Sequence, residues 1–190
     1  MVRVSRGGRE TWIAGLGCGL AAAVALLGTP VAPTAFAGTS GCAHANAEPS
    51  EASMRQFRAS ITCVINAERT SRGKGSLSKS PKLQKAAKAH NQLMLQRDCF
   101  KHRCGDEPSL TRRLRNVGYI RSGRWGAGES IGYDSTPNEM VAAWMGSSLH
   151  RANILRSAFR NIGVGVGRGS PHPPADDSAF LTYTVIFGYH

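Results

Sequence analysis

Hydrophobic residues recur at helical spacing in four separate parts of the chain. The first predicted helix has one apolar face, formed by Met54, Phe57, Ile61, Val64 and Ile65. A second helix is predicted to begin after Ser80 as its N-cap, and a third near Ser109. A fourth begins at Thr136, which has the spacing of a capping box with Glu139, and one or two further helical turns are predicted over residues 149–155.

The pattern changes to a period of two toward the C-terminal end. Ile162, Val164 and Val166 alternate with glycines, and residues 181–188 also alternate. A loop rich in Gly, Ser, Pro and Asp joins these segments, so we predict an antiparallel hairpin, with residues 128–133 as a candidate third strand. Helices followed by strands around one more helix predict an α+β domain, with helices packed on an antiparallel sheet.

The first 37 residues have the composition of a cleavable export signal. Three arginines precede an almost wholly apolar run over residues 12–27. Two prolines follow, and the small-x-small sequence Ala-Phe-Ala at residues 35–37 is typical of a signal peptidase site. The pattern therefore predicts that residues 1–37 are removed and that the protein is secreted, extracellular or associated with the cell envelope.

Two other interpretations of this N-terminal segment compete with the export signal. A retained membrane anchor would use the uncharged stretch over residues 11–40, which is long enough to span a bilayer. A lipoprotein would use Cys18, but the large apolar residue expected three positions earlier is missing. After the signal, we predict an N-terminal arm or linker over residues 38–52 and one globular domain over residues 53–190, with no further membrane-spanning segment.

Export changes the charge and the number of cysteines. The whole chain has a net charge of +12, and +10 remains without residues 1–37. The most basic cluster contains Arg112, Arg113, Arg115, Arg121 and Arg124. Loss of Cys18 leaves an even number of cysteines, which predicts two disulfides in an exported chain. Proximity favours Cys42–Cys63 and Cys99–Cys104, although three pairings are possible, and a zinc site is disfavoured because no spacing is Cys-x-x-Cys.

Three short segments contain the side chains best suited to chemistry. His102 lies between two cysteines, Glu129 lies in the Gly-Glu-Ser-Ile-Gly sequence over residues 128–132, and His150 lies in the segment over residues 144–155. Two imidazoles and a carboxylate suffice for a metal site with open positions or for acid–base catalysis. Each residue also has a purely structural interpretation as a surface side chain, a hydrogen-bond acceptor or a helix cap. Spacing alone does not bring the three together.

The order of these motifs resembles the CAP superfamily in its compact bacterial form. This superfamily contains cysteine-rich secretory proteins, antigen 5 and plant pathogenesis-related 1 proteins. The resemblance extends from about Phe57 to Gly188, and the segment from Trp144 to Leu155 is its most specific part. It implies a three-layer α-β-α sandwich with a central antiparallel sheet. It also implies a groove lined by two His and two acidic residues, which binds a divalent metal such as zinc in some members.

The resemblance assigns groove positions residue by residue. His102, Glu129 and His150 match the groove residues, which makes His102 and His150 candidate metal ligands and Glu129 a candidate catalytic residue. Three positions depart from the family pattern: Ser130 replaces the usual Asn, Ser147 stands where eukaryotic relatives have the second acid, and Val185 stands where many relatives have Gln. The identity of the second acidic residue therefore stays open.

Four functions follow from these observations as hypotheses. The first is a secreted, monomeric binding module whose groove, or an apolar cleft between helices, holds a lipid, sterol-like or peptide ligand, with no required cofactor. The second is a metal-dependent hydrolase or peptidase that uses His102, His150 and Glu129. The third is electrostatic binding of an acidic envelope polymer, with nucleic acid disfavoured because no aromatic-interleaved basic motif is present. The fourth is a stable scaffold with a vestigial groove.

Overall fold

The computed structural model describes residues 41–172 and 177–190, and within them the chain forms five α-helices, four strands and a short 3₁₀ helix. The helices are α1 (Met54–Thr70), α2 (Pro81–Gln96), α3 (Leu110–Asn116), α4 (Pro137–Gly146) and α5 (Ser148–Leu155). The strands are β1 (Ser78–Lys79), β2 (Gly126–Asp134), β3 (Asn161–Arg168) and β4 (Leu181–Tyr189), with the 3₁₀ helix over Asp177–Ala179. The predicted export signal, Cys18 and the alternative anchor lie outside the described residues.

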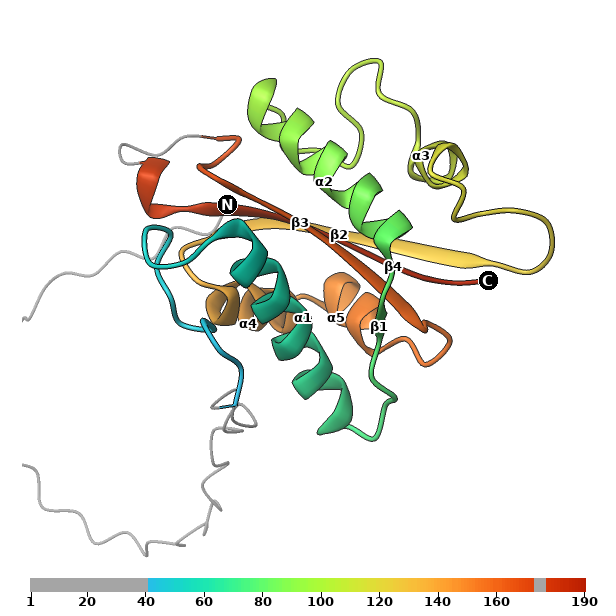
Figure 1. The fold of residues 1–190 in the computed structure, drawn as a ribbon, viewed down its shortest axis with the longest axis horizontal. Coiled ribbons are helices and arrows are strands. Elements are labelled where there is room, and N and C mark those ends of the chain that lie inside the picture. Colours follow the sequence, from blue (N-terminus) through green and yellow to red (C-terminus); the bar gives the residue numbers. More distant parts are fainter. Residues whose placement is uncertain (1–40, 173–176) are drawn as a thin grey trace, which may run out of the picture. The chain divides into compact units, whose positions relative to one another are not determined.

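The elements form three layers. Helices α2 and α3 lie over one face of the sheet, and α1, α4 and α5 lie over the other (Figure 1). A smaller apolar cluster joins α2 and α3 to Ile186 of β4, whereas the larger cluster joins α1, α4 and α5 to residues such as Val185 and Phe187 of the same strand. Because neighbouring residues of a strand point to opposite faces, β4 is buried on both sides from Leu181 to Gly188. The predicted α-β-α sandwich is confirmed.

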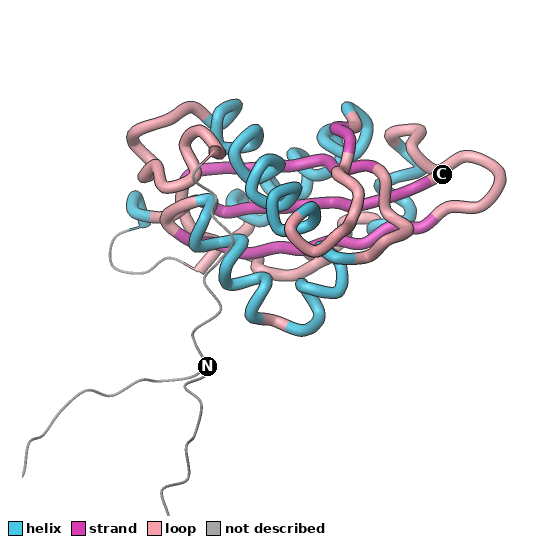
Figure 2. Tube along the Cα trace, turned by 90° about the horizontal axis from the view of Figure 1, so that it is seen from below, coloured by secondary structure: helices cyan, strands magenta, loops and turns pink. Residues whose placement is uncertain are grey.

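The sheet has the strand order β1-β3-β4-β2, and its long strands run side by side (Figure 2). The predicted hairpin is confirmed, since β3 pairs antiparallel with β4, and β2 pairs antiparallel with the other side of β4. One feature differs from the expectation of an antiparallel sheet: Ser78 and Lys79 pair parallel with Asn161 and Ile162, so the four-stranded sheet is mixed. A strand of two residues is too short to produce a periodic pattern, which is why the sequence did not predict it.

The glycines of β3 set the distance between the sheet and α2. A Cβ atom at Gly163 would lie 2.2 Å from backbone atoms of Leu83 and Gln84, and one at Gly165 would lie 2.4 Å from the carbonyl oxygen of Ala87. The helix backbone therefore rests directly on the strand at these positions. This contact explains why the face of β3 that meets α2 has glycines in place of larger side chains.

Helix caps form where the sequence placed them. The Ser80 hydroxyl accepts a hydrogen bond from the amide of Leu83 at the start of α2. Thr136 and Glu139 form the predicted capping box at the start of α4, which accounts for Glu139 without any role in a site. A further capping box at the start of α1, between Ser53 and Gln56, was not predicted.

Both predicted disulfides are present. Cys42–Cys63 bonds the segment before α1 to that helix, and Cys99–Cys104 closes the loop that follows α2. The described part of the predicted arm packs onto the domain, because Ala45 and Ala52 are buried. Within the described part of the chain, no helix is both long enough and apolar enough to cross a membrane.

Candidate functional site

The predicted site residues lie on three parts of the chain that meet at β2. His102 lies in the disulfide-closed loop after α2, Glu129 lies on β2, and His150 lies on α5. Nδ1 of His102 is 2.9 Å from Oε1 of Glu129, and Nδ1 of His150 is 3.2 Å from Oγ of Ser130. Burial, and then the charge of His102, lower the pKa of His150. We call these four residues, His102, Glu129, Ser130 and His150, the histidine site.

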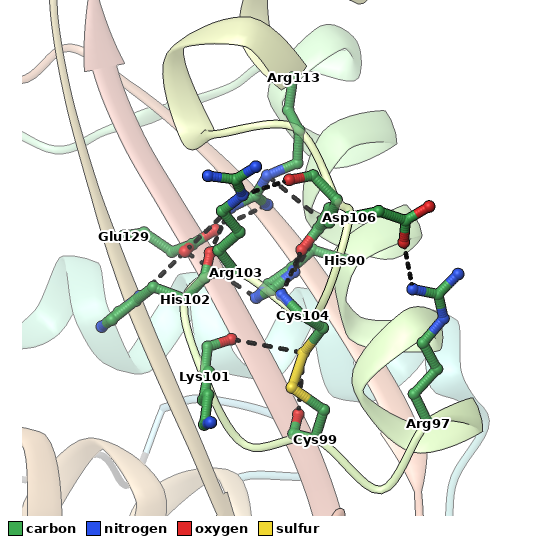
Figure 3. A network of polar contacts seen from close by, with 11 residues as sticks. His90, Arg97, Cys99, Lys101, His102, Arg103, Cys104, Asp106, Arg113 and Glu129 are labelled. Atoms are coloured by element: carbon green, nitrogen blue, oxygen red, sulfur yellow. Dashed lines mark hydrogen bonds and ion pairs between the residues drawn. A yellow bond between two sulfur atoms is a disulfide. The ribbon is translucent and has the colours of Figure 1, made fainter.

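Arg113 of α3 holds the carboxylate of this site. Its Nη1 atom is 3.0 Å from Oε2 of Glu129 and its Nη2 atom is 3.2 Å from Oε1, so the guanidinium donates two hydrogen bonds to the carboxylate (Figure 3). The same Nη2 atom donates to the carbonyl oxygen of His102 at 3.0 Å. The Glu129 side chain is 3 % exposed and the His102 side chain is 58 % exposed. The site thus has a buried, fixed carboxylate and an accessible imidazole.

A second layer of charge lies behind Glu129. His90 of α2 is fully buried, with Nδ1 2.9 Å from both carboxylate oxygens of Glu107 and Nε2 3.9 Å from Oε1 of Glu129 (Figure 3). Nε of Arg113 lies 3.5 Å from Oε1 of Glu107. We call His90, Glu107, Arg113 and Glu129 the buried ionic cluster. It links α2, α3 and β2 through side chains alone.

The two carboxylates of the buried ionic cluster have the same two partners. The two carboxylates of Glu107 and Glu129 face one guanidinium, that of Arg113. Each ring nitrogen of His90 is directed toward one of these carboxylates. Loss of Arg113 would therefore leave both buried carboxylates with a single ring as their partner within this cluster.

The ionisation of Glu129 is coupled to folding. Burial alone would raise the pKa of Glu129, but the hydrogen bond from His102 and the charge and hydrogen bonds of Arg113 outweigh it and hold the pKa below its usual value of 4.5. The ionised carboxylate thus contributes stability that is fully present above the unfolded-state pKa and is lost as the pH falls through the lower folded-state value.

We therefore expect the free energy of unfolding to fall with pH below about 4.5, with Glu129 as one contributor. Urea denaturation at several pH values in this acid range measures the profile. Glu129→Gln should flatten part of it, because an amide does not titrate, while Glu51→Gln at an exposed position serves as the matched control. An unchanged slope in Glu129→Gln would show that Glu129 is not coupled to folding in this way.

Side chains of the segment from Trp144 to Leu155 hold the backbone of β2 in place beside Glu129. Nδ2 of Asn153 donates to the carbonyl oxygen of Glu129 at 3.1 Å, and Nε1 of Trp144 donates to that of Ile131 at 3.1 Å. A Cβ atom at residue 128 would lie 2.6 Å from Oδ1 of Asn153 and 3.2 Å from Cζ of Phe159, so glycine leaves room for these two side chains. The segments over residues 128–132 and 144–155, which are separate in the sequence, are therefore in direct contact. This contact fixes β2 at the position of Glu129.

The family model of the cysteine-rich secretory protein family, CAP, matches residues 63–186 and thus includes the whole histidine site. The chain belongs to the CAP family. The predicted resemblance is confirmed.

A curated relative of this CAP protein comes from Bacillus subtilis (strain 168). The uncharacterized protein YkwD is 34% identical over 114 residues, which make up 60% of this chain and 43% of that protein. The chain therefore spans less than half the length of this relative.

Solved structures share the CAP fold at low identity. An extracellular protein containing an SCP domain from Bacillus anthracis has a TM-score of 0.57 at 22% identity, covering 70% of this chain and 42% of that one. An outer surface protein from Borrelia burgdorferi has a TM-score of 0.61 at 16% identity, covering 73% and 96%. A cysteine-rich secretory protein from Staphylococcus aureus has a TM-score of 0.52 at 19% identity, covering 72% and 39%. At these identities the likeness shows the fold.

The donor set for a metal in this CAP domain is small. Within residues 41–172 and 177–190, no group of three or more His, Cys, Asp or Glu side chains is placed to hold a metal ion. Both oxygens of Glu129 are engaged by Arg113 and His102. The Nε2 atoms of His102 and His150 make no hydrogen bond within the described residues, so these two imidazoles are the remaining candidate ligands. A metal bound by them would need water or a substrate to complete its coordination.

Sequence reasoning missed three members of the buried ionic cluster. His90 lies on the apolar stripe of α2, where a histidine is a possible core residue, and its polarity was a signal. Arg113 stands in the most basic cluster of the chain, but it is buried and ion-paired, so it does not add to a surface patch. Glu107 lies in a loop without periodicity, and nothing in the sequence marked it.

Proposed function

We propose that this CAP domain is an exported binding module, and that a hollow between α2 and α3 holds the apolar part of a lipid or sterol-like ligand. The hollow has a volume of about 360 Å³, which lies within the range of small-molecule sites. Its apolar lining consists of Ala86, Ala89, Leu93, Pro108 and Val117. This apolar lining between two helices is the observation that carries the proposal.

Polar groups at the same hollow would orient the ligand. Glu107 and Arg113 of the buried ionic cluster line it, together with Asn116. Nε of Arg113 is buried and faces Oε1 of Glu107 at 3.5 Å. The exposed side-chain amide of Asn116 would donate a hydrogen bond to a ligand oxygen such as a hydroxyl or carbonyl group. An amphipathic molecule with one oxygen-bearing end fits these requirements.

The state of Glu129 favours binding over hydrolysis. A general base needs a carboxylate that is free to accept a proton near the operating pH. The Glu129 carboxylate instead accepts hydrogen bonds from Arg113 and His102, and its pKa is held below the usual value. A carboxylate bound in this way orients the His102 ring and is a weak proton acceptor, so the hydrolase hypothesis lacks its base.

The proposed location outside the cytoplasm rests on three observations. The first 37 residues have the pattern of an export signal. The two disulfides of the described domain are typical of oxidising compartments. Two structural neighbours are described as an extracellular protein and an outer surface protein. A lipid or sterol-like molecule of the envelope is the ligand expected there, with a peptide as the alternative.

A filled-hollow variant tests the proposal. Ala89→Phe should weaken saturable binding of a fluorescent fatty acid by about tenfold or more, because the phenyl ring would occupy the hollow. Ala143→Phe is the matched control, since this exposed alanine lies within α4 on the other face of the sheet. Native mass spectrometry of protein secreted into culture medium would identify a retained lipid or peptide. No saturable binding by the wild-type protein, or equal binding by Ala89→Phe, would overturn the proposal.

A further inference from the structure

A second hollow lies at the β1 edge of the sheet, and its lining is basic. It has a volume of about 420 Å³ and is lined by Arg55, Arg58 and Thr62 of α1, Lys79 of β1 and Gln84 of α2. Because the strand order is β1-β3-β4-β2, this edge is opposite the edge formed by β2, where Glu129 lies. We call this hollow, with its cationic side chains Arg55, Arg58 and Lys79, the basic hollow.

The charge of the basic hollow is not balanced by the protein. No acidic residue lines it, and the side chains of Arg55, Arg58 and Lys79 make no ion pair or hydrogen bond within the described part of the chain. Other arginines do pair, such as Arg72 with Glu68 and Arg97 with Asp106. Three cations therefore share one concave surface without a counter-charge.

The arginines are placed to act together. They are three residues apart on α1, so their side chains lie on neighbouring positions of one helix face. Partial burial, and then the charge of Arg55, lower the pKa of Arg58. A bound anion would offset both the desolvation and the repulsion. The protein alone thus leaves an electrostatic cost that a ligand of the right charge would remove.

The polar groups in the hollow are donors. The side-chain oxygen of Gln56 is already used in the cap of α1, and the Thr62 hydroxyl donates to the carbonyl of Arg58. The Gln84 side chain, near the first turn of α2, makes no hydrogen bond among the described residues. Two guanidinium groups, one ammonium and one amide remain as donors, beside the positive end of the α2 dipole.

We propose that the basic hollow is a phosphate-binding site. Guanidinium groups bind the oxygens of a phosphate through paired hydrogen bonds, and a lysine adds a mobile point charge. The phosphate can belong to a small soluble phosphate or to the head group of an anionic lipid, and both present the same tetrahedral set of oxygens. This site is independent of the histidine site and of the hollow between α2 and α3, so it can hold when the proposed function fails.

The test compares two charge-matched double variants of the full chain. Arg55→Gln/Arg58→Gln removes both guanidinium groups of the basic hollow. Arg112→Gln/Arg115→Gln removes two exposed arginines with the same spacing on α3. Binding of inorganic phosphate is measured by two-dimensional amide NMR at constant ionic strength. Binding of phosphatidylglycerol vesicles, against phosphatidylcholine vesicles, is measured by co-sedimentation. Circular dichroism confirms that both variants are folded.

The expected result is specific loss of binding in one variant. Arg55→Gln/Arg58→Gln should weaken binding by about tenfold or more, and the α3 variant should stay within about twofold of the wild type. Phosphate-induced shifts should centre on residues 55–62, Lys79 and Gln84. Loss in the phosphate arm identifies a soluble phosphate, and loss in the vesicle arm alone identifies a lipid head group. Equal loss in both variants, or no wild-type binding in either arm, would overturn the proposal.

Discussion

Arg113→Met is expected to lower the free energy of unfolding by about 3–5 kcal/mol at neutral pH. The guanidinium is the partner of Glu129 at 3.0 and 3.2 Å and lies 3.5 Å from Glu107. Both carboxylates are buried, so removal of the cation leaves them with His90 and His102 as their only cationic or hydrogen-bonding side-chain partners among the described residues. Breaking a buried ion pair from one side costs more than the pair itself contributes, because the remaining charge stays desolvated. Chemical denaturation at pH 7 measures the loss.

The pH dependence of the Arg113→Met variant shows whether its loss of stability is electrostatic or comes from poorer packing. When a buried carboxylate loses its cationic partner, its pKa rises and the protonated form is favoured. The stability deficit of Arg113→Met should therefore shrink as the pH falls through the acid range, whereas a packing defect would stay constant. Arg112→Met, at the exposed neighbouring position, should change stability by about 0.5 kcal/mol or less. A deficit of that small size in Arg113→Met would contradict the assignment of the cluster.

The same variant connects the two parts of the proposed binding module. Arg113 lines the hollow between α2 and α3 and also donates to the carbonyl oxygen of His102. A ligand held in this hollow would lie beside the guanidinium that orients Glu129 and, through it, the His102 ring. The histidine site and the hollow between α2 and α3 therefore share the Arg113 guanidinium. Chemical shifts of the His102 ring are therefore expected to respond when the hollow is filled.

The sequence predicted the fold wherever a local pattern determined it. Helix starts were marked by Ser80 and by Thr136 with Glu139, because a capping side chain acts within one turn. The alternation of Ile162, Val164 and Val166 with glycines predicted a strand. Strand β1 was not predicted, because its two residues are held by pairing with β3 and by no pattern of their own.

The site was predictable only in part for the same reason. Family motifs located His102, Glu129 and His150, but the contacts that set their chemistry join residues far apart in the chain. Arg113 and Glu129 are 16 positions apart, and the basic character of Arg113 pointed to the surface. His90 and Glu107 are 17 positions apart, on a helix and a loop. A sequence gives the residue types of such a cluster, whereas only the tertiary packing decides which charges are buried together.

Gly165→Ala is expected to destabilise the protein by about 3 kcal/mol, since inserting a methyl group into a fully packed contact forces the backbone to shift. The added Cβ would lie 2.4 Å from the carbonyl oxygen of Ala87 and 2.6 Å from its carbon. These are backbone atoms of α2, so no side-chain rotation relieves the contact, and the helix has to move away from β3. His90 lies one turn further along α2, so this movement also disturbs the buried ionic cluster.

Gly146→Ala is the matched control for this substitution. A Cβ atom there meets nothing within 4 Å, and the residue ends α4. This variant should be neutral or slightly more stable, because alanine has less conformational freedom in the unfolded chain. Thermal and urea denaturation of both variants measure the difference, and amide hydrogen exchange in α2 reports whether the helix is displaced. If Gly165→Ala is as stable as Gly146→Ala, α2 does not rest on β3 as closely as the structure indicates, and the packing that positions His90 behind Glu129 has to be revised.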